Sequence, residues 1–415
     1  MVQAAVMGYG VVGSGVVEVL MEHKDSIARR TKEEIGIKYI LDIRDFPDSP
    51  FQDKFTKSFE DILNDDEVKV VAEVMGGVNP AYDFTKRLLE SGKSVVTSNK
   101  ELVATKGAEL LRIAKEHNVN YLFEASVGGG IPIIRPLSQC LAANDVIEIA
   151  GILNGTTNFI LTKMIRENMS FEDALAMAQK LGYAERNPAA DVEGHDAGRK
   201  ISILASLVYG KHVYPQYVHT QGITKITLDD VRYASAWGGV IKLIGQVKRL
   251  DDDTLDITVE PMFISRDSQL ANVDDVFNGI LVRGDSTGDV VFYGKGAGKL
   301  PTASAVAADI IDCVKHLNKR KYLDWADGDE SIVKPYEETV YPVYIRVSAD
   351  CDKKQLFDKA AELFTDVKEI VRSGSDNNEF AFTTGDMKAA DIEKAAASFE
   401  EWGAKVVSKI RIADL

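Results

Sequence analysis

Short apolar runs alternate with segments of helical periodicity at the start of the chain. Residues 2–7 (VQAAVM) form an apolar run, and from Val11 to His23 the apolar positions recur every three or four residues, which predicts a strand followed by a helix. Further strands are predicted at 37–41, 69–74, 94–97 and 121–125, and further helices at 59–65, 81–91 and 106–117. Strands separated by helices indicate a parallel sheet covered on both faces, so residues 1–135 are predicted to form a doubly wound, Rossmann-type α/β domain.

The pattern changes in the middle of the chain. Strand-like and helical segments are mixed there, which predicts an α+β domain for substrate binding, catalysis and dimerisation over 136–300. The predicted strands are 146–152, 255–265, 278–283 and 289–293, and the predicted helices are 156–167, 171–181, 193–209 and 228–236. A further helical segment, 301–318, is expected to pack back onto the first domain.

The last part of the chain has a third pattern. Residues 319–337 are rich in charge and are predicted to be a linker. From 338 to 415 the segments follow the order strand, helix, strand, strand, helix, strand, which is the ferredoxin-like arrangement. The predicted strands are 340–348, 367–373, 378–384 and 405–412, and the predicted helices are 353–364 and 389–401.

The composition is that of a globular protein, with 45% hydrophobic and 27% charged residues. No apolar run is long enough to span a membrane and the first residues lack the build of a signal peptide, so a cytoplasmic location is expected. The net charge of −15 disfavours binding to nucleic acid. Three distant cysteines, Cys140, Cys313 and Cys351, predict neither a disulfide framework nor a zinc site.

A glycine motif, G-x-G-x-x-G, lies between the first predicted strand and the first predicted helix. Its glycines permit a tight turn and a close approach of the backbone to a pyrophosphate at the helix N-terminus, so the motif predicts a dinucleotide site. The residues assigned to this site are Gly8, Gly10, Val11, Val12 and Gly13.

Two charged residues at the end of the second strand bear on the choice of cofactor. Asp42 favours NAD, because a carboxylate there accepts a hydrogen bond from the ribose 2′-hydroxyl. Arg44 favours NADP, because its guanidinium can pair with a 2′-phosphate. An ordinary surface ion pair is the third alternative, and all three stay open.

Candidate catalytic residues occur at two distant places. Gly76, Ser98 and Lys100 follow the third and fourth strands, whose loops face the cofactor crevice in such a sheet. Lys100 is thus a candidate active-site cation, although a lysine in a loop is more commonly solvated. Asp196 and Lys200 stand four apart in a predicted helix and share one face, either as catalytic groups or as an exposed ion pair.

Several separated motifs follow one another along the chain. They are GYGVVGSG, VMGGVNPA, TSNKELVATKG, FEASVGGGIPIIRPL, GILNGTTNFILTKM, LGYAERNPAADVEGHDAGRK and FYGKGAGKLPTASAV. In this order they resemble the homoserine dehydrogenase family over residues 1 to about 318. The resemblance implies an oxidoreductase that interconverts L-homoserine and L-aspartate 4-semialdehyde with NAD or NADP, in the biosynthesis of threonine, methionine and isoleucine. It also implies a homodimer or homotetramer.

The resemblance further implies roles for single residues. Lys200 corresponds to the family's proton carrier, with Lys100 and Asp196 as catalytic neighbours, and Gly296 and Gly298 join the cofactor site. The implied substrate-binding residues are Gly155, Thr156, Tyr183, Glu185 and Asp191, of which Glu185 would hold the substrate ammonium. A monovalent cation, sodium or potassium, is implied on the backbone carbonyls of Glu124, Val127, Gly129 and Ile131.

Physical chemistry adds one condition to these roles. A lysine acts as a base near neutral pH only if burial or a neighbouring cation lowers its pKa. We therefore expect Lys100 and Lys200 to converge across the crevice, with Asp196 orienting one of them. His195 lies in the same stretch but is interpreted as a packing or surface residue, and the acidic run 251–253 as a solvated turn.

The tail resembles an ACT domain, a small amino-acid-sensing fold. Such domains carry an Asp-x-Pro-Gly-like turn after their first strand, whereas this chain has ADCDKK at 349–354. Threonine as an effector is therefore one hypothesis for the tail, and a role in subunit assembly is the alternative. Deletion of 338–415 is predicted to leave the active site chemically competent.

Two other functions remain as alternatives. A dehydrogenase of another amino acid would share the cofactor domain, but the NGTTN and GYAE segments disfavour it. A non-catalytic amino-acid sensor would have lost a lysine or the glycine motif, and this chain keeps Lys100, Lys200 and Gly8 to Gly13.

Overall fold

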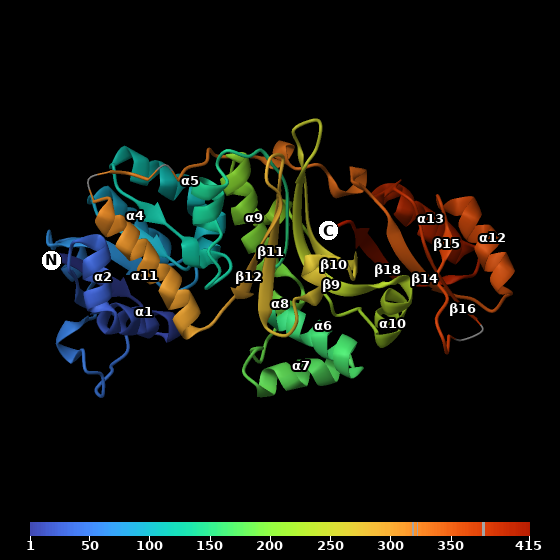
Figure 1. The fold of residues 1–415 in the computed structure, drawn as a ribbon, viewed down its shortest axis with the longest axis horizontal. Coiled ribbons are helices and arrows are strands. Elements are labelled where there is room, and N and C mark those ends of the chain that lie inside the picture. Colours follow the sequence, from blue (N-terminus) through green and yellow to red (C-terminus); the bar gives the residue numbers. More distant parts are fainter. Residues whose placement is uncertain (318, 322, 376–377) are drawn as a thin grey trace.

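The computed structural model describes residues 1–317, 319–321, 323–375 and 378–415. Figure 1 shows an elongated molecule, with the N-terminal domain at one end, a long sheet in the middle and the C-terminal tail at the other end. Residue 318, the predicted end of the returning helical segment, and residue 322 of the predicted linker lie outside the described residues. No helix in the described ranges is long and apolar enough to cross a membrane.

In the part of the chain that the structure describes, the first sheet has six parallel strands in the order β3-β2-β1-β4-β5-β6. The strands are β1 (Val2–Met7), β2 (Ile35–Leu41), β3 (Phe55–Thr56), β4 (Val68–Glu73), β5 (Ser94–Thr97) and β6 (Tyr121–Leu122). The helices are α1 (Val11–Glu22), α2 (Lys24–Thr31), α3 (Phe59–Leu63), α4 (Ala81–Glu90) and α5 (Lys100–Glu116). The strand order reverses between β1 and β4, so the loops after these strands open onto one crevice. The prediction of a Rossmann-like domain is confirmed.

The helix α11 (Lys299–Lys315) returns to this first domain and packs on α1. The two helices approach closely at Gly15, where a Cβ would fall 2.9 Å from the Cβ of Ala303. Figure 1 shows α11 beside the N-terminal helices α1 and α2. The segment predicted to pack back therefore does so.

Two elements of this domain have a bound that differs by three residues or more from the sequence prediction. The strand predicted at 121–125 ends at Leu122, because the Glu124 N–H donates to Asp309 Oδ2 at 2.8 Å and its carboxylate binds a later loop. The helix predicted at 106–117 begins at Lys100, where an asparagine cap starts it early. Helix α2 was not predicted, because Ile27 is the one residue it buries.

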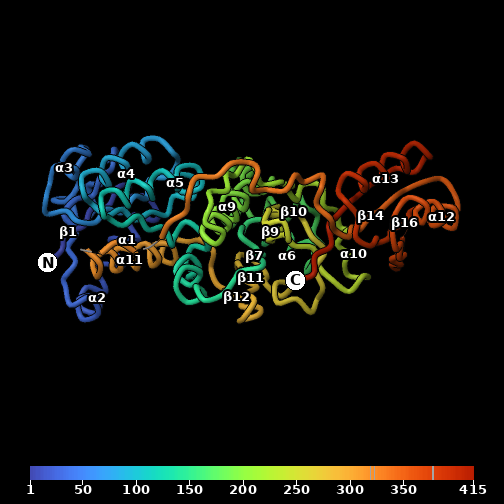
Figure 2. The backbone as a smooth tube through the Cα atoms, turned by 90° about the horizontal axis from the view of Figure 1, so that it is seen from above, coloured from blue at the N-terminus to red at the C-terminus, as the bar shows by residue number. Residues whose placement is uncertain are grey.

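In the described residues, a second, mixed sheet has ten strands, nine of them in the order β12-β11-β7-β9-β10-β18-β14-β16-β15 and β8 beside β10. Its central strands are β7 (Val146–Ile152), β8 (His219–Thr220), β9 (Gly239–Arg249), β10 (Leu255–Ser265), β11 (Phe277–Gly284) and β12 (Gly288–Lys295). The helices of this part are α6 (Gly155–Glu167), α7 (Phe171–Lys180), α8 (Ala189–Val192), α9 (His195–Tyr209) and α10 (Leu228–Trp237). Figure 2 shows α9 between the first domain and this sheet.

Strand β9 was missed by the sequence analysis although it is central. Its sequence contains Lys242 and Gln246, whose polar side chains obscure the strand pattern. Both are buried with partners: Lys242 Nζ donates to Val273 O at 2.6 Å, and Gln246 Nε2 donates to Glu148 Oε1 at 2.5 Å. Only tertiary contacts satisfy these groups, so local periodicity could not reveal the strand.

The tail has its own apolar core, formed by residues such as Ile345, Phe382 and Phe399. Its elements follow the predicted strand and helix order, but the strand predicted at 367–373 is reduced to two residues, and residues 376–377 between it and the next strand lie outside the described residues. The elements are β13 (Val340–Tyr341), β14 (Val343–Ser348), α12 (Lys353–Leu363), β15 (Lys368–Glu369), β16 (Glu379–Thr383), β17 (Met387–Lys388), α13 (Ala389–Glu401) and β18 (Lys405–Ala413). Because β18 pairs in parallel with β10, the tail continues the central sheet.

Candidate active site

The turn between β1 and α1 requires glycine. Gly8 has φ of +98°, and a Cβ at Gly13 would fall 1.8 Å from the Gly8 carbonyl oxygen. Gly10 is the N-cap of α1, and among the described residues no side chain caps this helix. The N–H groups of its first turn, which includes Val11 and Val12, are therefore left for an anion such as a pyrophosphate.

A cavity of about 430 Å³ lies beside this turn, where the ends of β2 and β4 meet. Asp42 accepts a hydrogen bond from Tyr9 N at 2.7 Å and a bidentate pair from Arg44, at 3.0 Å from Nε and 2.9 Å from Nη2. The Arg44 guanidinium lowers the pKa of Asp42 to about 2. The two residues that the sequence offered as rival cofactor determinants thus bind each other. The other polar or glycine residues lining the cavity are Gly8, Gly10, Lys57 and Gly76.

The helices α5 and α9 pack on each other, and charged side chains from their first turns meet. Lys100 is the first residue of α5, and the side chain of its N-cap, Asn99, accepts a hydrogen bond from Leu102 N at 3.1 Å. Asp196 and Lys200 lie near the start of α9, on one face as predicted. Lys100 therefore belongs to a helix, whereas the sequence had suggested a loop at this position.

One buried carboxylate joins both lysines. Lys100 Nζ lies 2.8 Å from Asp196 Oδ1, and Lys200 Nζ lies 2.7 Å from Asp196 Oδ2. Lys200 Nζ also donates to the carbonyl oxygen of Leu153 at 2.7 Å. The side chains of Asp196 and Lys200 are 7% and 10% exposed, so they are not the exposed surface pair that the sequence left as an alternative. The Lys100 side chain, 41% exposed, borders the crevice.

Burial and charge give the two lysines opposite pKa shifts. Burial lowers the pKa of Lys200, and the positive charge of Lys100 adds to this against the attraction of Asp196. Burial also disfavours the charged form of Lys100, but Asp196 outweighs it, so the pKa of Lys100 is raised. Burial opposes ionisation of Asp196 as well, yet the two lysines hold its pKa well below the usual range. The arrangement thus places a lysine with a lowered pKa, Lys200, beside a lysine with a raised pKa, Lys100.

A second carboxylate stands beside this group. Asn154 Nδ2 donates to Asp191 Oδ1 at 2.7 Å and to Asp196 Oδ2 at 2.9 Å. Burial raises the pKa of Asp191 above its ordinary value. Thr156 Oγ1 donates to the carbonyl oxygen of Tyr183 at 2.7 Å. This hydrogen bond connects Tyr183 to the first turn of α6, which begins at Gly155.

Three groups of this site had no role assigned to them from the sequence. The carbonyl of Leu153 and the bridging amide of Asn154 could be found only from contacts, although an asparagine before a helix is a recognisable N-cap signal. The third is Glu73, fully buried at the end of β4, which accepts hydrogen bonds from Thr97 Oγ1 at 2.7 Å and Met75 N at 2.9 Å. Thr97 Oγ1 in turn accepts from Asn99 N at 2.8 Å, so Glu73 supports the start of α5.

Other predicted residues are not brought into this group by their side chains. Glu185 is exposed, and its carbonyl accepts a hydrogen bond from Gln179 Nε2 at 3.2 Å. In the described ranges its carboxylate forms no ion pair. The Tyr183 ring is 44% exposed and packs edge-on against Phe159. His195 is exposed and pairs with Glu193, which agrees with its interpretation as a surface residue.

The segment implied to bind a monovalent cation packs against the glycine loop before α11. The carboxylate of Glu124 is committed to the N–H groups of Ile133, Ile134 and Arg135, so a cation there would have to use carbonyl oxygens. A Cβ at Gly129 would fall 2.4 Å from the carbonyl oxygen of Gly296, so glycine is needed for this contact. Among the described residues no group of histidine, cysteine and carboxylate side chains forms a metal site.

Comparisons with known proteins agree on one family. The family description "Homoserine dehydrogenase" matches residues 132–311, and "Homoserine dehydrogenase, NAD binding domain" matches residues 8–124. The homoserine dehydrogenase of Neisseria gonorrhoeae is 36% identical over 414 residues, which cover 96% of this chain and 95% of that protein.

Solved structures support the same relationship. A homoserine dehydrogenase from Thiobacillus denitrificans has a TM-score of 0.90 and 33% identity, and the match covers 100% of this chain and 98% of that chain. A hyperthermophilic archaeal homoserine dehydrogenase mutant in complex with NADPH has a TM-score of 0.64 and 28% identity, over 75% of this chain and 97% of that chain.

Proposed function

The chain belongs to the homoserine dehydrogenase family of NAD(P)-dependent oxidoreductases, and we propose that Lys100, Asp196 and Lys200 carry its interconversion of L-homoserine and L-aspartate 4-semialdehyde. The observation that supports these roles is the convergence of both lysines on one buried carboxylate. A bound nicotinamide would supply the hydride transfer to and from the alcohol carbon. The protein must then move the hydroxyl proton and stabilise charge on the oxygen.

Lys200 is the proton carrier in this proposal. Because burial lowers its pKa, the Lys200 amine becomes neutral at a lower pH than an ordinary lysine, and the neutral nitrogen can take the hydroxyl proton as homoserine is oxidised. In the reverse direction the Lys200 ammonium returns this proton to the oxygen. The Leu153 carbonyl and Asp196 fix the direction of the amine by hydrogen bonds.

Lys100 is the electrostatic partner. Its raised pKa keeps it charged, so it can stabilise the negative charge that develops on the substrate oxygen. Asp196 orients both lysines and prevents their mutual repulsion from separating them. Asp191, together with Glu185, is proposed to take the substrate ammonium, with Gly155, Thr156 and Tyr183 lining the same place.

The first domain fits a dinucleotide. The glycine turn leaves the N-terminus of α1 free for the pyrophosphate, and Asp42 and Arg44 border the cavity for the adenosine half. Val12, Gly76, Ser98, Gly296 and Gly298 are proposed as further cofactor contacts. A sodium or potassium ion is proposed on the carbonyl oxygens of Glu124, Val127, Gly129 and Ile131.

One steady-state assay tests these assignments together. Homoserine oxidation is measured with NAD and with NADP, in potassium, sodium and choline salts, with and without L-threonine. We expect turnover with at least one cofactor and a lower rate in choline than in the metal salts. Absence of homoserine oxidation under every condition would refute the proposed substrate, whereas equal rates in all salts would remove only the cation.

The pH dependence should differ between the two reaction directions. Because the Lys200 pKa is lowered, oxidation should gain rate as pH rises through a pKa below that of an ordinary lysine, and semialdehyde reduction should lose rate through the same pKa. At acid pH the KM for homoserine should rise as Asp191, whose pKa is raised, becomes neutral. Initial rates in both directions check this; limbs of equal sign in both directions would contradict it.

The tail is proposed to act in regulation or in assembly of a homodimer or homotetramer, within a cytoplasmic enzyme of threonine, methionine and isoleucine biosynthesis. Its own core and its strand order support an ACT-like domain. The turn at 349–354 keeps an Asp352 cap on α12, whose Oδ1 accepts from Lys354 N at 3.2 Å, in place of the glycine-containing turn of effector-binding relatives. This favours assembly over threonine binding, and an unchanged rate with threonine in the assay above would agree with it.

A further inference from the structure

Asn154 lies where the two carboxylates of the site meet, and its orientation is determined by hydrogen bonding. It is 5% exposed and is the N-cap of α6. Its Oδ1 accepts from Thr157 N at 2.9 Å and from Thr157 Oγ1 at 3.0 Å. A backbone N–H can only donate, so the oxygen of the amide must face Thr157 and the NH2 group must face Asp191 and Asp196.

The NH2 group connects the carboxylates of two successive helices. Asp191 belongs to α8 and Asp196 to α9, and Gly194 turns the chain between them with φ of +87°. One hydrogen of Asn154 binds Asp191 and the other binds Asp196, at 2.7 and 2.9 Å. Two nearby carboxylates repel each other, and a neutral group with two donors offsets this repulsion without adding a charge.

We propose that Asn154 is a positioning residue that keeps the two carboxylates in separate roles. By holding Asp191 on its own hydrogen, it leaves Asp196 to the two lysines and keeps Asp191 in place for the substrate ammonium. This inference depends on the proposed role of Asp191. The charged groups that act on Asp191 are Asp196 and Lys200 from α9 and Lys100 from α5.

Three variants separate this role from that of a helix cap. Asn154→Ser keeps a good N-cap but removes both NH2 donors, Asn154→Ala removes cap and donors, and Asn154→Asp keeps the cap but adds a third carboxylate. Ser170→Ala is the matched control, because Ser170 caps the neighbouring helix α7 and its side chain accepts from Asp173 N at 3.1 Å, away from the site.

For Asn154→Ser we expect a Tm close to that of the parent, unchanged NADPH binding and a KM for homoserine raised about tenfold, the effect of a lost hydrogen bond to a charged group. The acid limb of kcat/KM should move to higher pH, because the hydrogen bond from the Asn154 side chain favours the ionised form of Asp191 and is lost in this variant. Asn154→Asp should raise KM further. Ser170→Ala should lower Tm and leave KM unchanged.

Two results would overturn the inference. If Asn154→Ser keeps the parent KM and pH profile while Asn154→Ala loses stability, Asn154 is only a helix cap. If Asn154→Ser lowers kcat with KM unchanged, the amide serves the lysines and not the ammonium site. A parent protein without homoserine activity would instead refute the proposed function before any variant is compared.

Discussion

Replacing Lys200 with alanine should lower kcat for homoserine oxidation by about 10²–10⁴-fold, the usual contribution of a positioned acid–base group. The reason is that Lys200 is the one buried amine of the site whose pKa is lowered, while Lys100 stays charged. NADPH binding should remain, because Lys200 belongs to α9 and the glycine turn to the first domain. The fold should also remain, since Asp196 keeps Lys100 and Asn154 as partners.

Single-turnover and steady-state rates, with NADPH fluorescence titration, measure this effect. Lys180→Ala is the matched control, because Lys180 is an exposed lysine at the end of α7. The control should keep the parent kcat. Parent-like turnover of Lys200→Ala would remove Lys200 as the proton carrier, and a loss of NADPH binding would show that the substitution acts on the domain arrangement instead.

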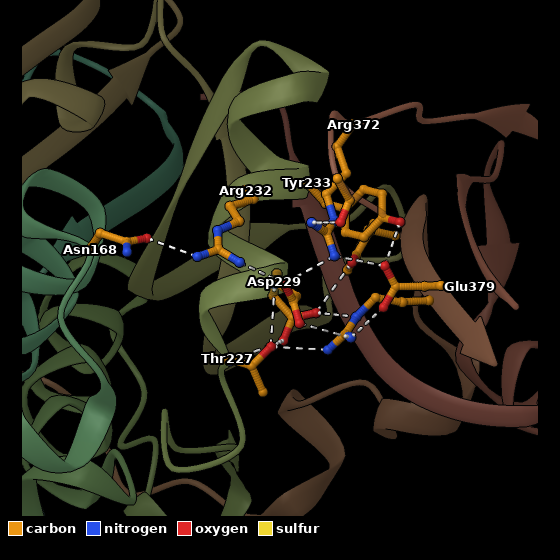
Figure 3. Close-up of polar contacts among 11 residues, drawn as sticks. Asn168, Thr227, Asp229, Arg232, Tyr233, Arg372 and Glu379 are labelled. Atoms are coloured by element: carbon orange, nitrogen blue, oxygen red, sulfur yellow. Dashed lines mark hydrogen bonds and ion pairs between the residues drawn. The ribbon is translucent and has the colours of Figure 1, made fainter. Parts of the chain in front are cut away.

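Replacing Arg346 with alanine should lower the free energy of unfolding by about 3–5 kcal/mol, the usual result of leaving one partner of a buried ion pair alone. Figure 3 shows polar contacts between residues of α10, such as Asp229 and Tyr233, and residues of the tail, such as Arg372 and Glu379. Arg346 joins the same group of contacts. Its Nε donates to Asp230 Oδ1 at 3.0 Å, and its Nη1 donates to Glu379 Oε2 at 3.0 Å. Asp230 is fully buried, so without Arg346 its charge has no cationic partner left among the contacts described.

Urea unfolding compares this variant with two others. Arg232→Ala is the matched control, because Arg232 lies on the same helix, is 47% exposed and pairs with Asp229; it should cost only about 0–1 kcal/mol. Adding Asp230→Asn to Arg346→Ala should restore part of the lost stability by removing the unpaired charge. Equal costs for Arg346→Ala and Arg232→Ala would contradict a structural role for this network.

Contacts between the tail and the rest of the chain also affect the predicted result of deleting residues 338–415. The tail supplies none of the active-site side chains described above, as the sequence analysis expected. However, β18 extends the central sheet, and Arg411 pairs with the buried Asp256 and Glu260 at 2.7 and 3.3 Å. Deletion of 338–415 would leave buried carboxylates without their arginine partners, so the point variants test the tail more cleanly.

Some elements could be predicted from the sequence and others could not. Strand β5, at Ser94–Thr97, follows the prediction because all four residues are buried in a parallel sheet and its last three residues, Val95, Val96 and Thr97, are β-branched. Strand β9 was missed because Lys242 is buried and satisfied by a distant carbonyl. The early start of α5 was missed because a single cap, Asn99, decides it.

Local chemistry made some of the site readable in advance. Glycines at fixed spacing after a strand specify the tight turn, and a spacing of four residues puts Asp196 and Lys200 on one helix face, because both depend on backbone geometry within one element. The convergence of Lys100 and Lys200 was expected, but the tertiary structure alone decided that both bind Asp196, that Arg44 binds Asp42, and that Asn154 bridges two carboxylates. These contacts depend on how separate elements pack and on which buried polar groups find partners, and no periodicity along the chain records that outcome.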